Sequence, residues 1–260
     1  MATKLATART AYLAQQRHVV DWLLALPPDI WKRSSRLSPW TVRELGFHVT
    51  DMTGVVVRAL AAGRVKDKAL TIAAYTSAWR DAAPEIAQRD REAAHGLTPG
   101  DVITNAARAR ADLLAALDAT PGDPVVMARR GPLRLSDLMA TRVNELVVHS
   151  LDLSASVPDV DPVVVDQGAV GISTRMLTGI LAERVPGHSV ELRVPPYAAV
   201  QCVAGPRHTR GTPPNVVEVE PVTWIEIATG RLSWTDAVDS GRVRASGDRA
   251  DISEHLPVLS

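Results

Sequence analysis

Residues 142–152 read RVNELVVHSLD and are the most informative segment of the chain. Five of its eleven positions are apolar. At ~100° per residue, the polar side chains of Glu145, His149 and Asp152 share one narrow arc of an α-helix. A surface helix usually has a wider polar face, so the pattern predicts a helix whose polar stripe faces an internal cleft. Glu145 and His149 are four residues apart and therefore lie on the same side of this helix.

A second helix is predicted around His48. Thr41 and Glu44 have the spacing of a capping box, which would begin a helix that runs to about residue 62. Ser38-Pro39 would instead begin the same helix three residues earlier. His48 falls inside the apolar sector of this helix, where an unpaired imidazole is costly.

The first 157 residues are predicted to be a helical domain. The periodicity of apolar residues and the positions of helix breakers indicate three further helices. A short hairpin follows them, and then a helix capped by Ser136. The expected ranges are residues 5–26, 72–94 with a bend near Pro84, 101–117, and 125–135 for the hairpin. Long helices with short breaks favour an antiparallel four-helix bundle.

The pattern changes at the proline-rich linker, residues 158–162. One helix is expected next, followed by β-branched and alternating segments that are typical of strands. The helix covers residues 164–183, the strands 190–194, 198–203, 216–219 and 242–245, and short helices 222–229, 233–240 and 250–255. The fold class is therefore α plus α+β, with a smaller α+β domain over residues 158–260.

Composition excludes several classes of protein. The chain has 260 residues, 46% of them hydrophobic, and 29 basic residues balance 29 acidic ones, so we expect a globular protein without a nucleic-acid partner. No uncharged run reaches the ~18 residues that cross a bilayer, and no signal peptide opens the sequence, so no membrane partner is expected. A single cysteine, Cys202, fits a reducing, cytoplasmic compartment. The protein is expected to be a monomer or a homodimer.

Two imidazoles and one carboxylate from two helices are a suitable donor set for one divalent metal ion with open coordination positions. His48, Glu145 and His149 supply them. Each histidine is followed three residues later by an aspartate, Asp51 or Asp152, which would orient the imidazole or hold a metal-bound water. Each part of this set also has a simpler interpretation. Glu145 and His149 could lie on an exposed helix, and His48 could be a core histidine that is hydrogen-bonded to a backbone carbonyl.

The sequence SPWTVRELGFH, residues 38–48, resembles the first signature of the mycothiol-dependent maleylpyruvate isomerases and their DinB-like relatives. Residues 142–152 resemble their second signature, and residues 224–231 (WIEIATGR) resemble their sterol-carrier-like α+β domain. Pro39 departs from the pattern, since relatives usually have glycine before the Trp-Thr pair. The resemblance implies that His48, Glu145 and His149 bind one divalent metal, usually zinc. It also matches Arg231 to an arginine that is important in the family.

The resemblance and the donor set together imply a zinc-dependent enzyme that uses mycothiol, an external low-molecular-weight thiol, as cosubstrate. It would isomerise a small electrophilic substrate or transfer sulfur to it. Arg231 and Arg142 would hold a substrate carboxylate. Cys202 has no activating motif and is not expected to be the nucleophile. Two alternatives stay open: a lipid or sterol carrier without catalysis, and a metal-dependent hydrolase with Asp51 or Asp152 as general base.

Overall fold

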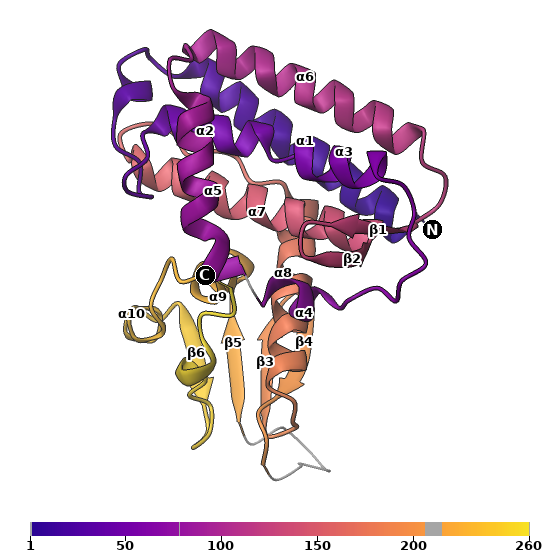
Figure 1. Cartoon of the computed structure of the whole chain (residues 1–260). Coiled ribbons are helices and arrows are strands. Elements are labelled where there is room, and N and C mark those ends of the chain that lie inside the picture. Colours follow the sequence, from indigo (N-terminus) through magenta and orange to yellow (C-terminus); the bar gives the residue numbers. More distant parts are fainter. Residues whose placement is uncertain (1, 78, 206–214, 260) are drawn as a thin grey trace. The chain divides into compact units, whose positions relative to one another are not determined.

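The computed structural model describes residues 2–77, 79–205 and 215–259, and the side chains of these residues other than 79–84 and 86. The chain divides into two compact units (Figure 1). The helical unit comprises Met1–Thr71 and Asp81–Ala169, and the mixed unit comprises Ile72–Arg80 and Val170–Ser260. In the described part of the chain, no helix is long and apolar enough to cross a bilayer.

Four helices form the bundle of the helical unit. They are α1 (Lys4–Ala25), α2 (Val42–Asp51), α6 (Pro99–Asp118) and α7 (Leu135–Ser156). Helix α1 packs against α7, and α2 packs against both α6 and α7. Helix α7 lies at the centre of this packing: many of its apolar side chains, Leu138, Leu146 and Val147 among them, have no exposed surface. A central helix of this kind is apolar on most sides, as its sequence predicted.

Smaller elements surround the bundle. They are the 3₁₀ helix η1 (Ile30–Lys32), α3 (Gly54–Ala61), α5 (Trp79–Ala94), and a hairpin of β1 (Val125–Ala128) and β2 (Gly131–Arg134). The hairpin is antiparallel, as the sequence predicted for residues 125–135. Helix α3 packs against α6 and the hairpin.

The capping box determines where α2 begins. The Thr41 side chain accepts a hydrogen bond from the Glu44 amide at 3.3 Å, and the Glu44 carboxylate accepts one from the Thr41 amide at 2.7 Å. The alternative start at Ser38-Pro39 is therefore wrong. The predicted single helix to residue 62 is also wrong, because α2 ends at Asp51 and α3 begins at Gly54. Glycine is a poor helix former, which favours a break at this point.

Two other helix boundaries differ from the prediction. Ser136 does not cap α7, because Arg134 occupies that position; the Ser136 amide and hydroxyl donate to the carboxylate of Asp123, at 2.7 and 2.8 Å. An aspartate there satisfies a free amide and complements the helix dipole. The predicted helix over residues 72–94 consists of α4 (Ile72–Thr76) and α5, and α5 continues through Pro84. The Thr76 hydroxyl bonds back to the Ile72 carbonyl at 2.8 Å, a contact that competes with helix propagation.

The mixed unit contains a four-stranded sheet in the order β4-β3-β5-β6. Its strands are β3 (Val190–Val194), β4 (Ala198–Cys202), β5 (Val216–Val219) and β6 (Val243–Ser246). Strands β3 and β5 are parallel, and the other two pairs are antiparallel. The helices are α4, α8 (Gln167–Arg184), α9 (Pro221–Ala228), α10 (Trp234–Asp239) and the 3₁₀ helix η2 (Ser253–His255). A helical unit followed by a smaller mixed one confirms the predicted fold class.

Arg184 explains why α4 belongs to the mixed unit. Its guanidinium donates to the carbonyl of Ala73 and the hydroxyl of Thr76, both at 3.1 Å, and to the carbonyl of Val258 at 2.6 Å. One side chain of α8 thus joins α4 to the end of the chain. We propose that the domain boundary lies between α7 and α8, at residues 157 and 158.

Candidate metal centre

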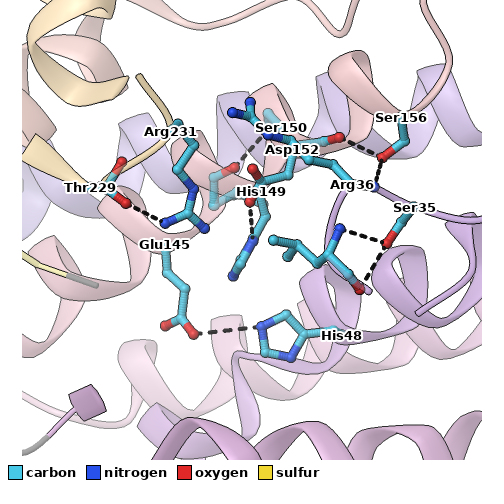
Figure 2. Close-up of polar contacts among 12 residues, drawn as sticks. Ser35, Arg36, His48, Glu145, His149, Ser150, Asp152, Ser156, Thr229 and Arg231 are labelled. Carbon is cyan, nitrogen blue, oxygen red and sulfur yellow. Dashed lines mark hydrogen bonds and ion pairs between the residues drawn. The ribbon is translucent and has the colours of Figure 1, made fainter. Parts of the chain in front are cut away.

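Three side chains from two helices of the helical unit converge on one point (Figure 2). His48 comes from α2, and Glu145 and His149 come from α7. One ligand atom from each lies within 4.8 Å of the other two, and His48 Nε2 is 3.6 Å from Glu145 Oε1. The two imidazole rings meet edge to face, with centroids 4.9 Å apart. The structure therefore brings together all three residues that the sequence proposed as metal ligands.

The outer nitrogen of His48 is held by a residue that the sequence did not suggest. Nδ1 lies 2.6 Å from the Oδ2 atom of Asp90 on α5. Asp51, the predicted partner, instead accepts a hydrogen bond from the side-chain amide of Asn105, with 3.4 Å between Nδ2 and Oδ1. Asp90, rather than Asp51, therefore orients the imidazole of His48, and a role of Asp51 in holding a metal-bound water stays a prediction. An aspartate between two arginines on a charged helix carries no signal of a contact 42 residues away.

The predicted partner of His149 is in place. Its Nδ1 atom lies 3.0 Å from the Oδ2 atom of Asp152, and the Asp152 side chain has no exposed surface. Because a carboxylate only accepts hydrogen bonds, Nδ1 must be the donor. A neutral His149 therefore presents the lone pair of its other nitrogen, Nε2, as a ligand atom.

Arg142 forms an ion pair with one of the three proposed ligands. Its Nη1 atom contacts the Oε2 atom of Glu145, one turn further along α7. The Arg142 side chain is 8% exposed and that of Glu145 19%, so the ion pair is largely buried. The guanidinium holds one oxygen of the carboxylate, and the other oxygen faces His48. The role of Arg142 in holding a substrate carboxylate stays a prediction.

Arg231 lies in the mixed unit, just after α9. Its guanidinium donates to the Thr229 carbonyl at 2.8 Å (Figure 2), and its amide donates to the Glu226 carbonyl at 2.7 Å. Gly230 precedes it with φ of 72°, a left-handed conformation that glycine adopts without strain. The structure thus places Arg231 in a closed turn at the end of α9. Its role in substrate binding stays a proposal.

The charges around the site differ between the two histidines. Burial alone would lower the pKa of His48, but its contacts with Asp90 and Glu145 outweigh this and raise the pKa to about 9. Burial lowers the pKa of His149 despite the hydrogen bond with Asp152. For Glu145, burial alone would raise the pKa; the charge of Arg142 and the contact with His48 outweigh burial and hold that pKa well below its usual range. Glu145 is therefore a carboxylate at neutral pH.

The donor set fits a divalent transition-metal ion. Two donors at the ~2.1 Å typical of zinc can be at most ~4.2 Å apart. The 3.6 Å between His48 Nε2 and Glu145 Oε1 lies within this limit, and the other two pairs of ligand atoms lie within 4.8 Å. Nitrogen and carboxylate donors suit zinc and its neighbours better than calcium or magnesium. Across the described part of the chain, this is the only group of three histidine, cysteine or acidic side chains found with such spacing.

Comparisons with known proteins match both units. A family model described as the mycothiol maleylpyruvate isomerase N-terminal domain matches residues 12–154, and one described as a bacterial SCP ortholog matches residues 166–258. The crystal structure of the mycothiol-dependent maleylpyruvate isomerase superposes with a TM-score of 0.64 and 16% identity, over 97% of this chain and 98% of the other. A variant of that enzyme with one histidine replaced by alanine gives the same values.

At this identity, the two structures show a shared fold over nearly the whole length of both chains. No curated protein matches the chain. The first family model spans more than half of the sequence and includes both segments that carry His48, Glu145 and His149. The chain therefore belongs to the family of the mycothiol maleylpyruvate isomerase N-terminal domain.

Proposed function

We propose that the protein is a zinc-dependent enzyme that uses mycothiol to isomerise a small electrophilic substrate of the maleylpyruvate type. The observation that carries the proposal is the convergence of His48, Glu145 and His149 in a chain of this family. The family and its solved relatives are named for mycothiol and maleylpyruvate, which supports a thiol and a small carboxylic acid as partners.

The donor set favours an anionic ligand. Two neutral imidazoles and one carboxylate around a divalent ion leave one net positive charge, which a single thiolate would neutralise. When bound there, zinc would supply the Lewis acidity that keeps a thiol deprotonated near neutral pH. Asp90 and Asp152 keep the two imidazoles oriented, and Arg142 holds one oxygen of Glu145 so that the other faces His48. These contacts fix the positions of the three metal-binding side chains before a metal ion or a thiol binds.

The chain itself offers no nucleophilic thiol. Cys202, its one cysteine, is fully buried in the mixed unit, and burial raises its pKa to about 11. It is therefore protonated at neutral pH and inaccessible to a substrate. A sulfur nucleophile must come from outside the protein, which agrees with a thiol cosubstrate.

The chemistry of isomerisation follows from reversible addition. The thiolate sulfur forms a bond to one carbon of a conjugated double bond, and the electron pair moves to the conjugated carbonyl. The former double bond is now single and rotates. Return of the electron pair expels the thiolate and restores the double bond with the opposite geometry. S-transfer would require protonation of the adduct and its release, and the family name favours isomerisation. We propose Arg231 as the group that holds the substrate carboxylate.

A thiol-omission assay tests this proposal. The purified protein is expected to contain about one zinc ion per chain and to isomerise maleylpyruvate only when mycothiol is present. Omission of the thiol should reduce the rate to the uncatalysed background, because no protein group replaces the sulfur nucleophile. Metal content is measured by elemental analysis, and turnover by the absorbance of the substrate. Undiminished turnover without thiol would contradict the proposal, and hydrolysis products in that reaction would indicate a metal-dependent hydrolase.

Metal affinity should depend on pH through His48. Its pKa of about 9 in the metal-free protein means that an incoming ion displaces a proton from this imidazole at any lower pH. The dissociation constant of Zn²⁺ should therefore fall by roughly tenfold per pH unit as pH rises from about 6.5, and level off near 9. His149, with a lowered pKa, adds no such dependence over this range. Chelator-buffered titrations at three pH values measure the dissociation constant of Zn²⁺. A constant affinity would contradict the assignment of His48 as a metal ligand.

A carrier function is the second candidate, because residues 166–258 match the bacterial SCP family model. A lipid or sterol carrier would co-purify with an apolar ligand and would show no thiol-dependent turnover. Solvent extraction of the purified protein, followed by mass spectrometry, separates the two functions.

A further inference from the structure

Asp90 is a partner of the metal centre that comes from a third helix. It lies on α5, whereas the three proposed ligands and the partners Arg142 and Asp152 lie on α2 and α7. Its side chain is 6% exposed, and its Oδ2 atom lies 2.6 Å from His48 Nδ1. A buried carboxylate at this distance from a buried imidazole makes a charge-assisted hydrogen bond.

The carboxylate of Asp90 is itself held in place. Its second oxygen, Oδ1, accepts hydrogen bonds from the Nε and Nη2 atoms of Arg89, at 2.8 and 2.6 Å. The Arg89 guanidinium thus binds one carboxylate oxygen of Asp90, and the other oxygen faces His48. A carboxylate with both oxygens engaged cannot rotate without breaking a hydrogen bond, so it defines a direction for the imidazole ring.

We propose that Asp90 is the positioning residue that commits His48 to binding the metal through Nε2. The proposal rests on the metal centre proposed above. A carboxylate only accepts hydrogen bonds, so the nitrogen that faces it must carry a proton. In a neutral imidazole with a proton on Nδ1, the lone pair is on Nε2. Nε2 is also the atom that faces Glu145, at 3.6 Å from Oε1.

His149 also has a carboxylate at its Nδ1 atom, but Asp152 and Asp90 reach their histidines in different ways. Asp152 is three residues from His149 on the same helix, so helix geometry alone brings the two together. Asp90 is 42 residues from His48 and reaches it only because α5 packs at this position. Asp90 therefore makes the affinity of the metal centre depend on the packing of α5. Outer partners of metal-bound histidines typically contribute 10–100-fold to metal affinity.

NMR spectroscopy of the cobalt-loaded protein provides the test. Co²⁺ binds at zinc sites and shifts the NMR resonances of the residues that bind it. The wild type should show two shifted, slowly exchanging imidazole N–H resonances, one from each histidine. Asp90→Ala should bind Co²⁺ roughly 10–100-fold more weakly and lose one of the two resonances to fast exchange with water. Asp90→Asn keeps an acceptor oxygen, so it should retain both resonances with a smaller loss of affinity. Glu92→Ala, which removes an exposed carboxylate from the same helix, should match the wild type.

The outcomes separate this proposal from the proposed function. If the wild type binds no stoichiometric Co²⁺, the metal centre and the role of Asp90 are both overturned. If the wild type binds Co²⁺ and Asp90→Ala binds it equally well with both resonances present, only the role of Asp90 is overturned. Should Asp90→Ala fail to fold by circular dichroism, the comparison of Asp90→Asn with the wild type decides: equal affinity and equal N–H exchange rates would count against positioning by a charged acceptor.

Discussion

Replacing His149 by alanine should abolish both stoichiometric metal binding and thiol-dependent turnover. His149 supplies one of three donors, and two donors do not hold a divalent ion tightly in competition with water. The loss of a direct ligand should exceed the 10–100-fold typical of outer partners, so metal affinity should fall by more than about 100-fold. Because the activating ion is absent, the rate with mycothiol should equal the background rate. Elemental analysis and the isomerisation assay measure the two effects on one preparation.

His95→Ala is the matched control for this variant. His95 is an exposed histidine in the helical unit, just after α5, and is not one of the clustered ligands. It should keep full metal content and activity, so the comparison separates loss of a ligand from loss of any histidine. A His149→Ala protein with one tightly bound zinc per chain would show that His149 is not a ligand.

Replacing Arg142 by methionine should destabilise the metal-free protein by about 3 kcal/mol, because the change leaves the largely buried Glu145 carboxylate without its guanidinium partner. Methionine keeps most of the volume and apolar packing of the arginine stem. The loss should be smaller in saturating zinc, since a bound ion supplies positive charge beside the same carboxylate. Urea unfolding with chelator and with zinc measures both values.

Two further variants make this result specific. Arg9→Met removes a surface ion pair with Asp118, whose side chain is 64% exposed, and should cost less than about 1 kcal/mol. The double variant Arg142→Met/Glu145→Gln removes the buried charge as well, so the metal-free double variant should be more stable than Arg142→Met alone. If Arg142→Met costs no more than Arg9→Met, the buried pair does not stabilise the unit as argued.

The helices were largely predictable because their signals are local. The capping box of Thr41 and Glu44 marks the start of α2, and the apolar pattern of residues 142–152 identifies a central helix. Residues a few positions apart determine such features, and they act whatever surrounds the helix. The errors also came from local reasoning. No residue within a turn of Ser136 indicates that Asp123, 13 residues earlier, accepts the hydrogen bond of the Ser136 amide at the start of α7.

Interactions between helices were the part that local reasoning could not supply. Asp51 and Asp152 follow their histidines with identical spacing, yet only Asp152 contacts its histidine. The difference arises because Asp90 on α5 already occupies the outer side of His48. Similarly, the sequence suggested Arg142 as a substrate-binding residue, whereas its short distance to Glu145 along α7 makes it a partner of the ligand set.

The sequence by itself indicated most of the elements, the presence of a helical and a mixed part, and the identity of the three proposed ligands. Helix periodicity and residue chemistry are properties of short segments and can be read along the chain. Only the tertiary structure decided that His48 meets Glu145 and His149, and which carboxylate holds each imidazole. Those contacts join α2, α5 and α7 across long stretches of chain, and they exist only when the buried faces of all three helices pack together.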